Sequence, residues 1–132
     1  MIYSIGWIVK IRVYYEDTDA GGVVYHTNYI KYCERARSEV FFVNDSSPEM
    51  NGCHFVVSDI TCKFIKSAKL GDILDIKTEL LEKKNVSLLL KQTIFLKDEK
   101  IFEMQVRVGF VDKSGKITKI PQELKSYFCI KG

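Results

Sequence analysis

The chain has 132 residues, of which 46% are hydrophobic and 28% are charged, which suits one globular domain spanning residues 1–132. Its formal net charge is +3, and because the basic residues are spread along the chain, a nucleic-acid-binding protein is not expected. No stretch approaches the about 20 apolar residues that cross a bilayer, and Lys10 and Arg12 interrupt the apolar N-terminus where a signal peptide would be continuous. We therefore expect a cytoplasmic protein.

The first expected elements are a strand and a long helix. Residues 8–15 alternate between apolar and basic side chains, which predicts a half-buried strand. After the turn-like sequence DTDAGG, residues 27–44 carry an apolar stripe at helical spacing, with Thr27 or Asn28 as the expected N-cap. The stripe consists of Tyr29, Cys33, Ala36, Val40 and Val43. Its breadth indicates a helix that other elements wrap.

The remainder of the chain reads as strands. Residues 54–65, 73–81, 86–96 and 101–111 alternate or are continuously apolar, and short polar turns separate them. Connections of hairpin length imply antiparallel pairing. One helix packed on one antiparallel sheet predicts an α+β domain.

The four cysteines are expected to be reduced thiols. Cys33, Cys53, Cys62 and Cys129 include no pair at C-x-x-C spacing. Cys53 and His54 are adjacent, but the other ligands of a metal site are missing. Neither a metal nor a cofactor is expected.

The segment DTDAGGVVYHTNY places an acid pair, a glycine pair and a histidine within a short stretch. Asp17 and Asp19 precede a glycine pair, and His26 lies where the helix is expected to begin. The first amide groups of a helix have free N–H donors, so a carboxylate beside them can act on a carbonyl while the donors stabilise an oxyanion. An ordinary turn is the alternative, because Asp and Gly favour turns and a histidine can simply cap a helix.

A longer segment, VYYEDTDAGGVVYHTNYIKYCERARSE, resembles the signature of the hotdog-fold acyl-CoA thioesterases. It is most similar to the branch of the 4-hydroxybenzoyl-CoA thioesterase family that bacteria encode beside the Tol-Pal envelope system. The resemblance implies a hotdog fold, in which a curled antiparallel sheet wraps a long helix. It also implies a homodimer whose sheets join, often paired into a homotetramer, with active sites at the dimer interface.

The resemblance also implies roles for individual residues. Asp19 matches the catalytic carboxylate, the backbone N–H near His26 matches the oxyanion donor, and Asp17 receives no catalytic role. Tyr25, His26 and Asn28 match the run that shapes the site, and Glu34 matches an acidic position of the helix. His26 is expected to assist catalysis by orienting the thioester or Asp19, or by protonating the leaving thiolate.

The expected reaction is hydrolysis of an acyl-CoA, with Asp19 as nucleophile or general base. His26 and Thr27 stand where the aromatic-acyl branch has an aromatic-proline pair, so the resemblance implies an aliphatic acyl group. The phosphates of CoA would meet Lys63, Lys66 and Lys69, although these lysines could equally be solvated at a sheet edge. Possible partners are an acyl carrier protein or envelope-associated proteins. The alternatives are a hotdog dehydratase or hydratase, and a non-catalytic acyl-binding scaffold.

Overall fold

The structure is a computed structural model that describes residues 7–128. The expectations for the extreme N-terminus and for Cys129 therefore lie outside the described residues. The elements run in the order β1 (Trp7–Arg12), a short 3-10 turn (Tyr15–Asp17), α1 (His26–Phe42), β2 (Glu49–Met50), β3 (Cys53–Phe64), β4 (Ile73–Lys83), β5 (Ser87–Leu96), β6 (Glu99–Val111) and α2 (Gln122–Lys125).

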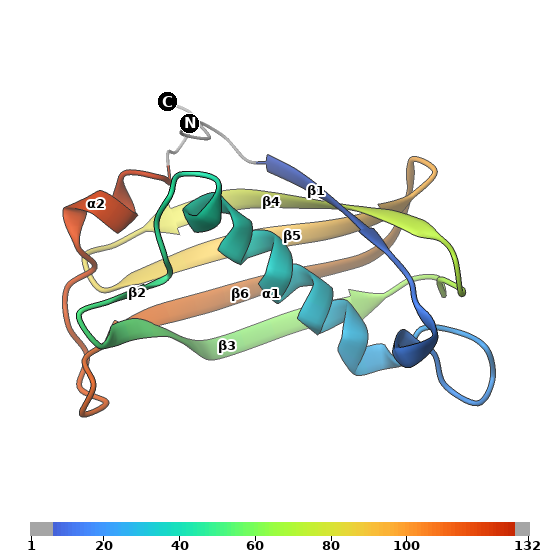
Figure 1. Ribbon diagram of the computed structural model, residues 1–132, viewed down its shortest axis with the longest axis horizontal. Helices are drawn as coiled ribbons and strands as arrows, with labels where there is room; N and C mark the ends of the chain where they lie inside the picture. Colours follow the sequence, from blue (N-terminus) through green and yellow to red (C-terminus); the bar gives the residue numbers. More distant parts are fainter. Residues whose placement is uncertain (1–6, 129–132) are drawn as a thin grey trace.

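A six-stranded antiparallel sheet curls around the long helix, which confirms the hotdog fold (Figure 1). The spatial order of the strands is β1-β4-β5-β6-β3-β2. In Figure 1, α1 runs across the concave face of the sheet, and its first turn lies at the end where β3 finishes. The four long strands match the four predicted ones, with boundaries that differ by a few residues.

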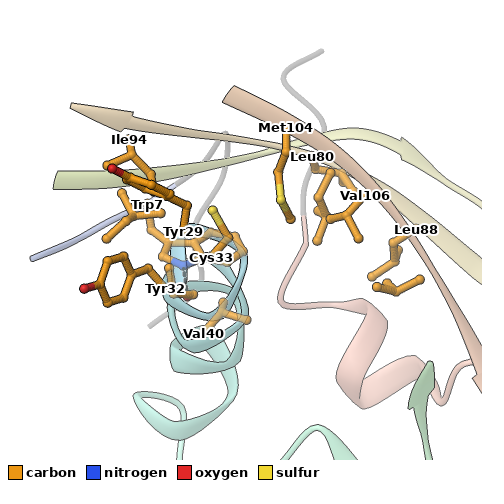
Figure 2. Packing of buried hydrophobic residues seen from close by; sticks show 14 of the residues in the cluster. Trp7, Tyr29, Tyr32, Cys33, Val40, Leu80, Leu88, Ile94, Met104 and Val106 are labelled. Atoms are coloured by element: carbon orange, nitrogen blue, oxygen red, sulfur yellow. Dashed lines mark hydrogen bonds between the residues drawn. The ribbon is translucent and has the colours of Figure 1, made fainter. Parts of the chain in front are cut away.

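The core lies between α1 and the sheet. Strand β6 alternates as its sequence predicts, with Phe102, Met104, Val106, Val108 and Phe110 all buried. Figure 2 shows helix side chains such as Tyr29, Cys33 and Val40 packed near strand side chains such as Met104 and Val106. Each buried aliphatic or aromatic side chain contributes about 1.5–3 kcal/mol relative to leaving it in water, so this layer fixes where α1 lies.

Two details of the predicted helix are wrong. The N-cap is Tyr25 and the helix begins at His26, so neither Thr27 nor Asn28 is the cap. Asn28 is buried, and its amide donates to Asp17, which prevents it from capping the helix. At the other end, Val43 is 49% exposed because the helix finishes at Phe42, which leaves Val43 beyond the buried stripe.

Strand β3 forms an incomplete edge of the sheet. One side pairs with β6 from His54 to Phe64, whereas the short β2 pairs on the other side only at Cys53 and His54. The outer edge from Phe55 to Phe64 therefore has no partner strand among residues 7–128. Several apolar side chains on this strand and just after it are exposed: Val56, Val57, Ile60, Phe64 and Ile65.

Candidate active site

The loop between the 3-10 turn and α1 folds into a tight turn around Asp19. The Asp19 N–H donates to the Val23 carbonyl at 2.9 Å, and the Gly22 N–H donates to the Asp19 carbonyl at 3.0 Å. Gly22 has a φ of 81°, a conformation that side chains disfavour, which explains a glycine at this position. The turn thus fixes the backbone that carries Asp19.

The Asp19 carboxylate is held by one oxygen and free at the other. Its Oδ1 accepts hydrogen bonds from the N–H of Gly21 at 2.8 Å and, more weakly, from the N–H of Val23 at 3.4 Å. No hydrogen bond to Oδ2 is formed among residues 7–128, and the residue is exposed. One carboxylate oxygen is therefore oriented by the turn while the other can react.

The Asp17 carboxylate, two residues earlier, has a different environment. It is 4% exposed, its Oδ1 accepts the Asn28 amide at 2.8 Å, and its Oδ2 accepts the Tyr14 N–H at 2.9 Å. Burial, and secondarily the neighbouring Asp17, raises the pKa of the Tyr32 hydroxyl. Asp17 therefore ties the loop to the first turn of α1, and its position is that of a structural group.

The start of α1 supplies two free backbone donors. The Tyr25 N–H donates to the Asp17 carbonyl and the Asn28 N–H donates to the Tyr25 carbonyl. The N–H groups of His26 and Thr27 have no acceptor among the described residues. Such groups carry partial positive charge and can bind a developing oxyanion.

A pocket of about 320 Å³ joins this helix start to the end of β3. It brings together three of the predicted site residues, Asp19, His26 and Lys66. The Lys66 ammonium pairs with the Glu99 carboxylate at 2.8 Å on the surface, so it lies at the rim rather than inside. An exposed pair of this kind adds little stability.

The other predicted site residues lie elsewhere. Tyr25 packs its ring on His26 with centroids 4.4 Å apart, and Asn28 is buried and does not line the pocket. Glu34 lies on a second groove farther along α1. The Lys69 backbone pairs with Val23, and its side chain does not contribute to the Asp19 pocket. Lys63 lines a separate surface hollow beside Lys91 and Glu103.

The sequence interpretation missed the apolar wall of the pocket. This wall includes Tyr29, Phe64 and Ile65, together with Val23 and Val24. The chain after β3 reaches the loop because the Val24 N–H donates to the Ala68 carbonyl at 2.9 Å. The Ala68 N–H in turn donates to the Tyr29 hydroxyl at 3.0 Å. In the sequence, only the apolar end of β3 indicated such a wall. The loop residues Val23 and Val24 that complete it lie far from β3 along the chain.

No cluster of three or more histidine, cysteine, aspartate or glutamate side chains that could hold a metal ion occurs within residues 7–128. Cys33, Cys53 and Cys62 are free thiols. Burial raises the pKa of the Cys33 thiol to about 12, so it is an unreactive core residue. None of the helices in the described part of the chain is long and apolar enough to span a membrane.

Curated relatives match most of the chain. It is 44% identical over 115 residues to an acyl-CoA thioesterase YbgC of Helicobacter pylori, covering 80% of this chain and 86% of the relative. It is 37% identical over 129 residues to an acyl-CoA thioesterase YbgC of Haemophilus influenzae, covering 93% and 94%. Both relatives span nearly the same domain as this chain.

Solved structures share the fold. A probable thioesterase from Bartonella henselae superposes with a TM-score of 0.83 at 27% identity, covering 88% of this chain and 99% of the other. A DHNA-CoA thioesterase from Staphylococcus aureus gives a TM-score of 0.84 at 26% identity, covering 96% and 89%. The thioesterase superfamily model matches residues 21–103, from the glycine pair through most of the sheet. The chain belongs to the thioesterase superfamily.

Proposed function

We propose that the protein hydrolyses the thioester of an aliphatic acyl-CoA, with Asp19 as the catalytic carboxylate. The observation that carries this proposal is the arrangement of Asp19 and the start of α1 around one pocket: Asp19 is held through Oδ1, and within residues 7–128 neither its Oδ2 nor the N–H groups of His26 and Thr27 have a hydrogen-bond partner. The relatives in Helicobacter pylori and Haemophilus influenzae, which are named acyl-CoA thioesterases, support the same activity.

The reaction follows from the geometry of this pocket. The thioester oxygen faces the start of α1, where each good donor to the oxyanion contributes about 3–4 kcal/mol. Asp19 then attacks the carbonyl and expels the CoA thiolate, giving a mixed anhydride that water hydrolyses, or it takes a proton from a water that attacks the carbonyl and displaces the thiolate. Intact-protein mass spectrometry after rapid quenching separates the two routes, because the first leaves an acyl group on Asp19.

His26 and the apolar wall complete the proposed site. His26 contributes to the pocket and packs edge-on against Phe64, with ring centroids 6.3 Å apart. This position suits a group that orients the thioester or protonates the departing thiolate. Tyr29, Phe64 and Ile65 offer hydrocarbon contact and support an aliphatic acyl chain. Lys66 is the lysine that we assign to the CoA phosphates.

A homodimer is part of the proposal. The unpaired edge of β3 would remain a liability in water, and its exposed apolar side chains continue to Phe64 and Ile65 at the Asp19 pocket. Pairing this edge with the same edge of a second copy gives one continuous sheet and covers the open side of the pocket. Three further expectations stay predictions. They are the pairing of two dimers into a homotetramer, a cytoplasmic location, and an acyl carrier protein or envelope-associated proteins as partners.

The test measures hydrolysis by wild type, Asp19→Asn and Glu16→Gln. The substrates are acyl-CoA molecules of different chain lengths, and the released CoA thiol is detected. Asp19→Asn should fold normally and lose nearly all turnover, because an amide neither attacks a carbonyl nor accepts a proton. Glu16 is an exposed acid of the preceding 3-10 turn, so Glu16→Gln should match wild type. Equal turnover by wild type and Asp19→Asn would overturn the assignment.

A further inference from the structure

A second hollow lies farther along α1, on the side of the first half of β3. It is a groove of about 400 Å³ between α1, the segment around Pro48 and the strand residues from His54 to Val57. The groove continues into a notch of about 40 Å³ whose walls are apolar, formed by Phe41, Phe55, Leu88, Leu90, Val108 and Phe128. Neither hollow includes Asp19 or His26.

Arg37 lies at the junction of the groove and the notch, because it lines both. Its Nη1 donates to the Gln92 Oε1 at 3.3 Å. Gln92 is fully buried and fixed in turn, since its amide donates to the Cys33 carbonyl at 2.7 Å and to the Thr78 hydroxyl at 2.9 Å. The buried Gln92 network therefore fixes the position of the Arg37 guanidinium.

Residues 7–128 use little of the hydrogen-bonding capacity of Arg37. A guanidinium has five N–H donors, and the bond to Gln92 occupies one of them. No carboxylate lies within 4.0 Å of its nitrogens among residues 7–128. Burial lowers the pKa of Arg37, and the nearby Glu34 partly offsets this effect. The groove thus presents spare donors beside an apolar notch.

The proposed dimer brings this groove to the other copy's Asp19 pocket. Two identical strand edges that join about a twofold axis must run antiparallel, so the first half of β3 lies beside the second half in the partner. The groove adjoins the first half, from His54 to Val57, and the Asp19 pocket adjoins the far end at Phe64. Each groove therefore faces the catalytic pocket of the opposite copy.

We propose that the groove receives the far end of the acyl chain held at the other copy's Asp19, and that Arg37 donates to an oxygen there. Acyl groups with a terminal hydroxyl or carboxylate are then preferred over plain hydrocarbon chains of equal length. Glu34 and Glu49 line the same groove, so recognition depends on direct bonds to Arg37 rather than on a positive field. This inference rests on the proposed thioesterase function and on the β3 dimer.

The first test uses three substrates whose acyl groups each have six carbons: hexanoyl-CoA, 6-hydroxyhexanoyl-CoA and adipoyl-CoA. Arg37→Met should lower kcat/KM for the two oxygen-bearing substrates about tenfold or more, and for hexanoyl-CoA by less than about threefold. Arg37→Lys should recover part of the loss. Arg35→Met, at an exposed arginine of the same helix, is the matched control and should change none of the three values.

The outcomes separate the inference from the function on which it rests. An equal loss on all three substrates would show that Arg37 only supports the fold, and no loss would show that the acyl chain does not reach it; either result overturns the inference. Wild-type hydrolysis of hexanoyl-CoA in the same experiment keeps the proposed function in place. If wild type hydrolyses no acyl-CoA, the proposed function itself fails.

The second test asks whether Arg37 acts on the opposite copy. Mixed dimers of one Arg37→Met chain and one Asp19→Asn chain are purified through two different tags. If Arg37 acts across the interface, one of the two sites is intact, and kcat/KM for adipoyl-CoA is about half of the wild-type value. If Arg37 acts within its own chain, the mixed dimer shows no more activity than half that of Arg37→Met, which overturns the inference.

Discussion

Asp17 and Asp19, the two acids that precede α1, have different environments. Asp17 is buried between an amide and a backbone N–H, whereas Asp19 is exposed and one of its oxygens accepts no hydrogen bond from residues 7–128. The composition D-x-D cannot distinguish them, because burial depends on the packing of α1 against the loop. The assignment of Asp19 to catalysis came from the family resemblance, and the different surroundings of the two carboxylates agree with it.

Asn28 is expected to act through Asp17 rather than through substrate. Asn28→Ala removes the 2.8 Å bond to a buried carboxylate, so the free energy of unfolding should fall by about 1–3 kcal/mol. Asn28→Asp should be worse, since it places a second carboxylate against Asp17. Urea unfolding measures both variants, with Thr27→Ala at the neighbouring exposed position as control. Lost turnover with unchanged stability would instead support the predicted contact with substrate.

His26 is expected to assist the chemistry. A positioned acid or base contributes about 10²–10⁴-fold, so His26→Ala should lower kcat within that range and remain more active than Asp19→Asn. His26→Gln should recover part of the loss if the ring acts mainly by hydrogen bonding. Steady-state kinetics on one acyl-CoA decides between these roles. Wild-type kcat in His26→Ala would make the histidine a structural residue at the start of the helix.

At the element scale, the sequence predicted well the elements whose pattern is local. Strand β6 and the stripe of Tyr29, Cys33, Ala36 and Val40 followed from periodicity, because one face of each is buried. The start of α1 did not follow, since Asn28 bonds to Asp17 instead of capping the helix. The pocket wall was also missed, because it depends on a loop pairing with the chain after β3.

The Tyr29 side chain connects α1 to the loop after β3, two elements that both line the Asp19 pocket. Its hydroxyl accepts the Ala68 N–H at 3.0 Å and its ring stacks on Phe102 with centroids 5.4 Å apart. Tyr29→Phe leaves the Ala68 N–H unpaired, so the free energy of unfolding should fall by about 1–3 kcal/mol and kcat/KM should fall with it. Urea unfolding and steady-state kinetics measure the two effects.

The control for Tyr29→Phe is Tyr25→Phe, because the Tyr25 side chain is 47% exposed and makes no hydrogen bond through its hydroxyl within the described structure. Its stability should equal that of wild type. If Tyr29→Phe is as stable and as active as wild type, water replaces the lost acceptor and the loop is positioned by packing alone.

Across the whole molecule, one chain holds the proposed catalytic carboxylate but leaves its pocket open along β3. The outer edge from Phe55 to Phe64 lacks a partner strand in the described part of the chain, and the row of exposed apolar side chains runs along it. An edge of this length is protected in natural proteins by charge, by a bulge or by pairing. The pairing of β3 with β6 has a bulge-like register shift between Val57 and Asp59, but β3 continues as a strand before and after it.

The last prediction follows from this edge. Ile60 is 37% exposed near the middle of β3, so Ile60→Asp should place a charge on each copy at the centre of the proposed joint sheet. Two like charges brought together and removed from water oppose association, so the variant should sediment as a folded monomer while wild type sediments as a dimer or larger assembly. Its kcat/KM should fall strongly, because the pocket then stays open to water.

Ile8→Asp is the control: Ile8 is 63% exposed on β1, at the opposite edge of the sheet, and its substitution should preserve both assembly and turnover. A wild-type monomer with full activity, or an Ile60→Asp dimer with unchanged sedimentation, would show that β3 is not the edge through which the copies join.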